Sequence, residues 1–270
     1  MEEIKETVNL EKFPIQRITS GGKQDTEDVV ISEFPLTIIL NNQELVTLLC
    51  SPVDLKYLAV GFLFSEGLLK NKADIQKVLV DDRRGVVRVE SKGDSVITSE
   101  LMGKRLITSG CGRGASFYSA TDVEEQVNIE SQVKLSAANV FSLTKGFQHH
   151  SQIYRATGGV HSAALCDTKS ILIFKEDIGR HNAIDKIFGE CMLKDIPTED
   201  YIIITSGRIS SEILLKVARR AIPVLISKSA PTNMGVKLAD DMGITLIGFV
   251  RGERMNVYTH GWRIVTSGKT

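Results

Sequence analysis

The chain has 270 residues, enough for one large domain or two modest ones. Apolar residues make up 42% of it and charged residues 24%, values that argue against a disordered, fibrous or membrane-spanning protein. The 33 basic and 33 acidic side chains cancel, so no overall field attracts nucleic acid or an anionic membrane, and any anion site must be local.

The N-terminal region carries no targeting or membrane signal. It lacks the apolar core of a secretory signal, and the chain has no run of about 18 apolar residues. We therefore expect a cytoplasmic protein. Residues 1–27 are polar and contain the pair Gly21 and Gly22, which predicts an N-terminal segment with little order before Val29.

Residues 28–107 predict a small α+β domain. Two apolar runs form a predicted hairpin, because Asn41 and Asn42 between them tolerate the positive φ of a tight turn. Pro52 marks the start of a helical pattern. The expected elements are strands over 29–40 and 43–51, a helix over 53–69, and strands over 74–80 and 86–90.

A linker is predicted next, because residues 91–132 are rich in Gly, Ser, Thr and acidic side chains. Its part over 108–132 is expected to be a flexible loop that carries Cys111. After it, short β-rich runs alternate with amphipathic helices, which predicts an α/β domain over 133–270 with a largely parallel sheet. The expected helices cover 134–150, 180–193, 209–221 and 233–242, and the strands 170–174, 201–206, 223–227 and 244–250, with 161–165 ambiguous.

Anion-binding residues are predicted at the carboxyl ends of these strands, where open α/β sheets bind their ligands. Ser206 and Gly207 could hold a phosphate by their backbone while Arg208 pairs with it. The alternative is that these are ordinary turns with solvated arginines. No P-loop or Rossmann motif occurs. The candidates on three such loops are Ser206, Gly207, Arg208, Ser229, Arg251 and Arg254.

The histidines are less clearly functional than the residues of these loops. His161 follows two glycines beside small apolar residues, which favours a packed, hydrogen-bonded core group over a ligand or base. His181, near a helix start, could meet an anion or act as acid or base. Asp177 and Asp185 fit a helix cap or an ion-pair partner equally well.

A zinc site of the deaminase type is not expected. Such enzymes use H-x-E and P-C-x-x-C motifs. Here His161 is followed by Ser162 and Ala163, and no P-C-x-x-C occurs. The sequence therefore argues against a zinc hydrolase.

The four cysteines fall into two groups. Cys50, Cys166 and Cys191 lie in or beside apolar runs, far apart, and are expected to be buried free thiols. Cys111 differs, because glycines on both sides would expose its thiol and Arg113 could stabilise a thiolate. Either this thiol reacts, or it lies by chance in an ordinary turn.

Several segments, in order, resemble the signatures of the formate dehydrogenase accessory sulfurtransferase family (FdhD). They are TGGVHSAAL (157–165), EDIGRHNAIDKIFG (176–189), TSGRISSEILLKVARRAIPVLISKSAPT (205–232) and GFVRGERMNVYTHG (248–261). The run 61–69 and the loop around Cys111 resemble the N-terminal half of that family.

The resemblance implies a cytoplasmic, homodimeric sulfur carrier. Such a protein takes sulfur from a cysteine desulfurase as a persulfide and passes it to the molybdenum cofactor, in its bis(guanine dinucleotide) form, before that cofactor enters formate dehydrogenase. The implied C-terminal fold is cytidine-deaminase-like, three-layered and without zinc. By position, Cys111 matches the persulfide cysteine, and the cofactor-binding segment is matched by Phe249, Val250, Arg251, Gly252, Glu253 and Arg254.

One position departs from the family pattern. Many members carry Cys-x-x-Cys in this loop, whereas here Gly114 takes the second place. A second thiol could release the sulfur by forming a disulfide; a single one needs an outside reductant or thiol, or direct attack by the acceptor. A non-catalytic chaperone that holds the cofactor or a guanine nucleotide is therefore the alternative to a sulfur carrier.

Overall fold

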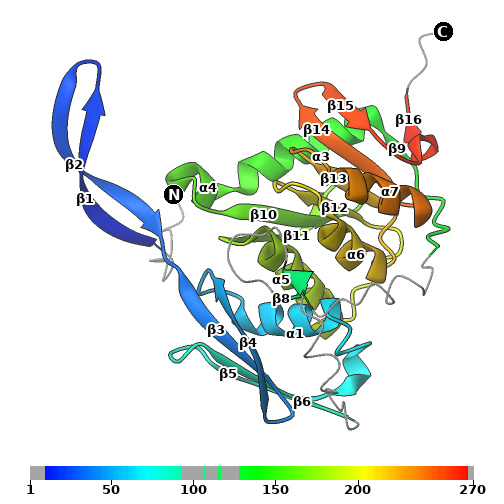
Figure 1. Cartoon of the computed structure of the whole chain (residues 1–270). Helices are drawn as coiled ribbons and strands as arrows, with labels where there is room; N and C mark the ends of the chain where they lie inside the picture. Colours follow the sequence, from blue (N-terminus) through cyan, green and yellow to red (C-terminus); the bar gives the residue numbers. More distant parts are fainter. Residues whose placement is uncertain (1–9, 93–105, 108–114, 117–127, 267–270) are drawn as a thin grey trace.

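The computed structural model describes residues 10–92, 106–107, 115–116 and 128–266 (Figure 1). Together they combine an α+β N-terminal domain, an α/β C-terminal domain and a β-hairpin that projects from both, which confirms the expected fold class. Within these ranges no helix is long and apolar enough to cross a membrane.

A six-stranded mixed sheet forms the centre of the C-terminal domain. Its strands are β10 (His161–Cys166), β11 (Ile171–Asp177), β12 (Ile202–Thr205), β13 (Val224–Ser227), β14 (Thr245–Arg251) and β15 (Arg254–Val257). Their order is β11-β10-β12-β13-β14-β15, in which only β12, β13 and β14 are parallel neighbours. The prediction of a largely parallel sheet is wrong, because antiparallel hairpins add β10 and β11 at one side and β15 at the other.

Helices cover both faces of this sheet and make three layers (Figure 1). Strands β12 and β13 are buried throughout, as expected for apolar runs covered on both faces. The helices are α5 (Arg180–Leu193), α6 (Ser211–Arg219) and α7 (Asn233–Asp241) on one face and α3 (Ala137–His150) on the other, with the short α4 (Gln152–Thr157) after α3. Ser136 and Thr232 cap α3 and α7 by accepting hydrogen bonds from backbone N–H groups of their first turns.

The N-terminal domain has a four-stranded sheet with one helix on it. Its elements are β3 (Phe34–Leu40), β4 (Gln43–Cys50), α1 (Leu55–Ser65), the 3-10 turn η1 (Lys72–Asp74), β5 (Ile75–Asp81) and β6 (Val86–Ser91), in sheet order β4-β3-β6-β5. Asn41 and Asn42 have φ of 47° and 64°, which confirms the predicted tight turn. The helix is shorter than its predicted span of 53–69, because Asp54 at its start has φ 58° and the chain turns at Gly67 with φ 75°.

A two-stranded hairpin projects from the body of the molecule (Figure 1). Strands β1 (Leu10–Thr19) and β2 (Gly22–Ile31) pair over their whole length, and we call residues 10–31 the arm. The prediction of little order before Val29 is therefore wrong. Most side chains on both faces of the arm are exposed, so its sequence lacks the alternation that marks a half-buried strand.

Helices α1 and α5 meet where the two domains join, and there α5 carries two buried ion pairs, one of which also accepts a hydrogen bond from α1. Lys216 Nζ lies 2.6 Å from Asp185 Oδ2, and Ser65 Oγ donates to the same carboxylate at 2.6 Å. Lys186 Nζ lies 2.6 Å from Asp177 Oδ2. The expectation that both aspartates are caps or ion-pair partners is confirmed.

The predicted linker is described only in part. Strand β7 (Leu106–Ile107) pairs antiparallel with β8 (Ala115–Ser116). Cys111 belongs to the segment between them and lies outside the described residues. At the other end of the predicted linker, Ile129 is buried in the core of the C-terminal domain, and its carbonyl accepts a hydrogen bond from the buried Arg263.

Candidate functional site

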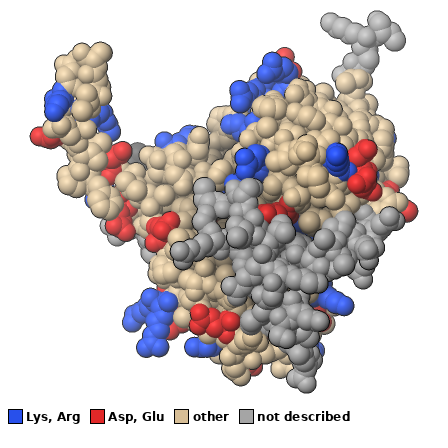
Figure 2. Space-filling view, in the orientation of Figure 1, with Lys and Arg blue, Asp and Glu red and all other residues tan. Residues whose placement is uncertain are grey.

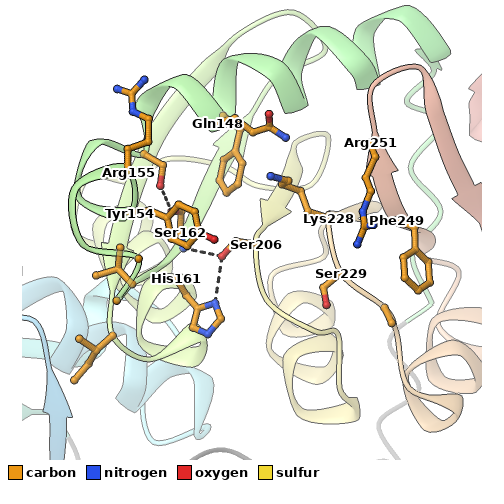
Figure 3. Close-up of a pocket in the computed structure, with 17 residues that line it drawn as sticks. Gln148, Tyr154, Arg155, His161, Ser162, Ser206, Lys228, Ser229, Phe249 and Arg251 are labelled. Atoms are coloured by element: carbon orange, nitrogen blue, oxygen red, sulfur yellow. Dashed lines mark hydrogen bonds between the residues drawn. The ribbon is translucent and has the colours of Figure 1, made fainter. Parts of the chain in front are cut away.

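A cavity of about 730 Å³ opens at the edge of the sheet where β12, β13 and β14 have their carboxyl ends (Figure 3). The loops after these strands form one side, and α3, α4 and the start of β10 form the other. This is the edge at which the sequence predicts a ligand. The cavity lies at this edge because the three parallel strands β12, β13 and β14 end there side by side.

Two cations, Lys228 and Arg251, line this cavity from the sheet, and a third, Arg155, lines it from α4. Lys228 follows β13 and Arg251 ends β14, so neighbouring strands place them together (Figure 3). Burial lowers the pKa of Lys228, and the charge of Arg251 lowers it further. Among the described residues that line the cavity, none is acidic. A bound anion would relieve the repulsion between Lys228 and Arg251.

Neutral polar groups line the cavity where the loop after β12 meets the start of β10. Ser206 Oγ accepts a hydrogen bond from the backbone N–H of Ser162 at 3.0 Å and lies 3.3 Å from His161 Nδ1 (Figure 3). Burial lowers the pKa of His161, with Arg180 acting in the same direction, so this ring is neutral near pH 7. His161 is therefore hydrogen-bonded as predicted, but it lines a cavity instead of lying in the core.

Phe249 also lines the cavity, and the backbone explains how. Its φ is 54°, and the pairing of β14 with β15 shifts register between Gly248 and Arg251. Its N–H donates to the carbonyl of Ser229, at 3.2 Å. This local distortion accompanies an aromatic ring that lies beside Arg251 (Figure 3).

The cavity takes in only some of the predicted site residues. Ser206, Ser229, Phe249 and Arg251 line it. The others do not belong to its lining: Val250 is buried in the core, Gly207 packs on Arg180, Gly252 and Glu253 form the turn into β15, and Arg208 and Arg254 are exposed. Of the three arginines expected at one anion pocket, only Arg251 therefore belongs to the lining of this cavity, while Arg208 follows β12 and Arg254 begins β15.

Sequence reasoning missed several lining residues. Lys228 lies in the loop after β13, one of the loops predicted to bind an anion. Its place directly after a strand would have indicated that it belongs to the site. Phe147, Gln148, Tyr154 and Arg155 come from α3 and α4. No local sequence pattern identified these four residues as part of a site. Helix α4 has only six residues, too few for a clear pattern, and the sequence of α3 shows only the apolar periodicity of a helix packed on a sheet.

The described cysteines behave as predicted. Cys50, Cys166 and Cys191 are free and buried. Burial raises the pKa of the first two thiols to about 12 and of the third to about 11. Thiols of this kind are poor nucleophiles.

Comparison with known proteins assigns the chain to a family. The FdhD/NarQ family model matches residues 31–265. A protein named sulfur carrier protein FdhD from Bacillus pumilus (strain SAFR-032) is 46% identical over 253 residues, which cover 94% of this chain and 97% of the relative. The chain belongs to the FdhD/NarQ family.

Other members of the FdhD/NarQ family agree in sequence and in fold. The sulfur carrier protein FdhD of Bacillus subtilis (strain 168) is 43% identical over 250 residues, 93% of this chain and 95% of the relative. A crystal structure described as that of a formate dehydrogenase accessory protein from Desulfotalea psychrophila has a TM-score of 0.77 and 28% identity, and the match covers 95% of this chain and 100% of that one.

Proposed function

We propose that this chain is a sulfur carrier that serves formate dehydrogenase. Cys111 accepts sulfur from a cysteine desulfurase as a persulfide, and the chain passes it to the molybdenum cofactor before that cofactor enters the enzyme. The names of the FdhD relatives support the carrier role. The observation that carries the proposal is a cavity lined by three cations, Arg155, Lys228 and Arg251, with no acidic side chain among its described lining residues.

The cavity suits a nucleotide-bearing substrate. The bis(guanine dinucleotide) form of the cofactor carries pyrophosphate groups, which Arg251 would bind through its planar guanidinium and Lys228 as a point charge. Phe249 and Tyr154 offer aromatic surface for a base. The hydroxyl of Ser229 adds a hydrogen-bond donor.

Loading of the carrier is a thiol exchange. The thiolate of Cys111 attacks the outer sulfur of the desulfurase persulfide, a new S–S bond forms, and the thiolate of the desulfurase leaves. No net oxidation occurs in this step. Because Gly114 replaces a second thiol, unloading depends on an outside thiol or reductant, or on direct attack by the acceptor.

Mass spectrometry after incubation with a desulfurase and cysteine tests the carrier role. We expect one added sulfur atom on the peptide that contains Cys111, and none in Cys111→Ala. The matched control Cys50→Ala, which removes a buried thiol, should keep the adduct. An adduct that persists in Cys111→Ala, or that never forms, would contradict the proposal.

A second candidate is a non-catalytic chaperone for the cofactor or a guanine nucleotide. Gly114 in place of a second thiol favours it. Calorimetric titration with guanosine diphosphate, taken together with the sulfur-adduct experiment, distinguishes the carrier from the chaperone. Nucleotide binding without a sulfur adduct supports the chaperone, and both together support the carrier.

A further inference from the structure

Helix α4 contributes Tyr154 and Arg155 to the cavity but buries none of its own side chains. It has six residues, and a helix this short is not stable by itself in water. Figure 3 shows the two residues across the cavity from Phe249 and Arg251. Figure 2 shows basic side chains at α4 and over the turn between β14 and β15. The place of Tyr154 and Arg155 in the cavity therefore depends on what holds the ends of α4.

The start of α4 is held by Ser151. This residue lies between α3 and α4 and is 6% exposed. Its Oγ lies 2.7 Å from Ser162 Oγ and 2.7 Å from Glu176 Oε1. Its carbonyl accepts a hydrogen bond from the N–H of Arg155, at 3.2 Å. One buried serine therefore connects the first turn of α4 to Glu176.

Glu176 and the two serines form a chain of hydrogen bonds with one direction. Ser162 lies opposite Glu176 in the pairing of β10 with β11. Each hydroxyl has a single hydrogen, and a carboxylate only accepts. Both 2.7 Å contacts are satisfied when Ser162 donates to Ser151 and Ser151 donates to Glu176; the contact of Ser162 with Glu176 is longer, 3.3 Å. The bond from Ser151 to the carboxylate is charge-assisted and therefore strong.

The other end of α4 is held through the backbone. Gly158 ends the helix with φ 66°, and its N–H donates to the carbonyl of Tyr154 at 2.7 Å. Gly159 lies against Ile31 at the base of the arm. These contacts fix the last turn of α4, whereas Ser151 fixes the first.

The charge of Glu176 does not explain its place beside an anion site. Ser151 and Ser162 line the cavity, but Glu176 does not. A carboxylate behind the lining repels a bound phosphate, so by charge alone its removal would strengthen binding. A role in holding α4 gives the opposite expectation, because its removal would free the helix that carries Tyr154 and Arg155.

We propose that Glu176 is a positioning residue for the ligand of this cavity: through Ser151 it fixes α4 and places Tyr154 and Arg155 against that ligand. Tyr154 then offers its ring to the base, and Arg155 its guanidinium to a phosphate. Glu176 does not touch the ligand. The inference rests on the proposed function, in which the cavity binds the guanine nucleotide part of the cofactor.

Isothermal titration calorimetry of the full chain with guanosine diphosphate tests this role. Glu176→Ala and Ser151→Ala should each weaken binding roughly 3- to 10-fold, because each removes the hydrogen bond that holds α4. Ser151→Ala leaves the contact of Ser162 with Glu176 in place, so it tests the role even if Glu176→Ala does not fold. Glu176→Gln removes the charge but keeps an acceptor for Ser151, so it should bind at least as tightly as the unchanged chain.

A double-variant cycle shows through which side chains Glu176 acts. In a chain that carries Tyr154→Ala and Arg155→Ala, Glu176→Ala should cause no further weakening, because α4 then has no side chain to place on the ligand. The matched background is Lys228→Met, which removes a cation of the sheet. There Glu176→Ala should weaken binding as much as in the unchanged chain. Circular dichroism verifies that each variant is folded.

Three outcomes would overturn the inference and leave the proposed function standing. They are unaltered binding in the Ala variants of Glu176 and Ser151, equal weakening by Glu176→Gln and Glu176→Ala, and weakening by Glu176→Ala that persists without the side chains of Tyr154 and Arg155. An unchanged chain that does not bind guanosine diphosphate would contradict the proposed function and this inference together.

Discussion

Gly61 of α1 and Gly189 of α5 lie against each other where the two domains meet. A Cβ on Gly61 would lie 1.8 Å from the carbonyl oxygen of Asp185, and a Cβ on Gly189 would lie 1.9 Å from that of Tyr57. The two helices therefore touch backbone to backbone, with no room for a methyl group. This contact brings Ser65 of α1 within hydrogen-bond distance of Asp185.

Gly61→Ala is expected to lower the free energy of unfolding by about 3 kcal/mol or more, because a methyl group must separate two packed helices. Denaturant unfolding measures this. The control is Gly146→Ala in α3, whose Cβ would lie 3.7 Å from Ile171. It should be neutral or stabilising by up to about 1 kcal/mol. Equal stabilities for the two variants would contradict the close contact.

Lys228→Met and Arg251→Met should each weaken binding of guanosine diphosphate by roughly 10- to 100-fold, because each removes a charge-assisted contact of about 1.5–3 kcal/mol. Isothermal titration calorimetry measures the change. Arg254→Met is the matched control. Arg254 lies opposite Arg251 in the backbone pairing of β14 with β15, but it does not line the cavity. A larger loss in the Arg254 variant would point to a different binding surface.

Thiol labelling should distinguish Cys111 from the other cysteines. In the folded chain at about pH 8, iodoacetamide is expected to modify one thiol, Cys111. Cys50, Cys166 and Cys191 should react only after unfolding, because burial raises their thiol pKa values to about 12, 12 and 11. Peptide mapping identifies the modified site. Rapid labelling of any of these three in the folded chain would contradict the burial described here.

Stability should fall as the pH drops below about 6.5, in part because of His181. Burial, and then the charges of Lys216 and Arg180, lower the pKa of His181 from 6.5 to about 3. Glu212 lies 3.3 Å away, but burial raises its own pKa and weakens it as a counter-charge. Between those pKa values the unfolded chain binds a proton that the folded chain does not, so acid favours unfolding.

At pH 5 this group alone should lower the free energy of unfolding by about 2 kcal/mol relative to pH 7. His181→Gln should flatten the slope between pH 7 and 5 by that amount, as measured by urea unfolding. His149→Gln, at an exposed site on α3, is the control and should keep the slope. A slope that is unchanged in His181→Gln would show that this histidine is protonated in the folded chain.

Local patterns were sufficient for most of the fold. The apolar runs that became β12 and β13 and the asparagine pair between β3 and β4 predicted their elements, because periodicity and turn chemistry depend on neighbours in the chain. The arm escaped prediction because both its faces are largely exposed. Strand β15 was not predicted because its four residues, Arg254–Val257, are too few to show a strand periodicity.

The sequence by itself determined the family and predicted the sheet edge at which the cavity opens. Only the tertiary structure decided which side chains meet there. Lys228 and Arg251 are far apart in the chain and become neighbours through the parallel pairing of β13 with β14, while Arg254 is exposed outside the cavity lining. The physical reason is that a side chain's direction depends on strand register and backbone distortion, such as the positive φ of Phe249, which distant contacts set.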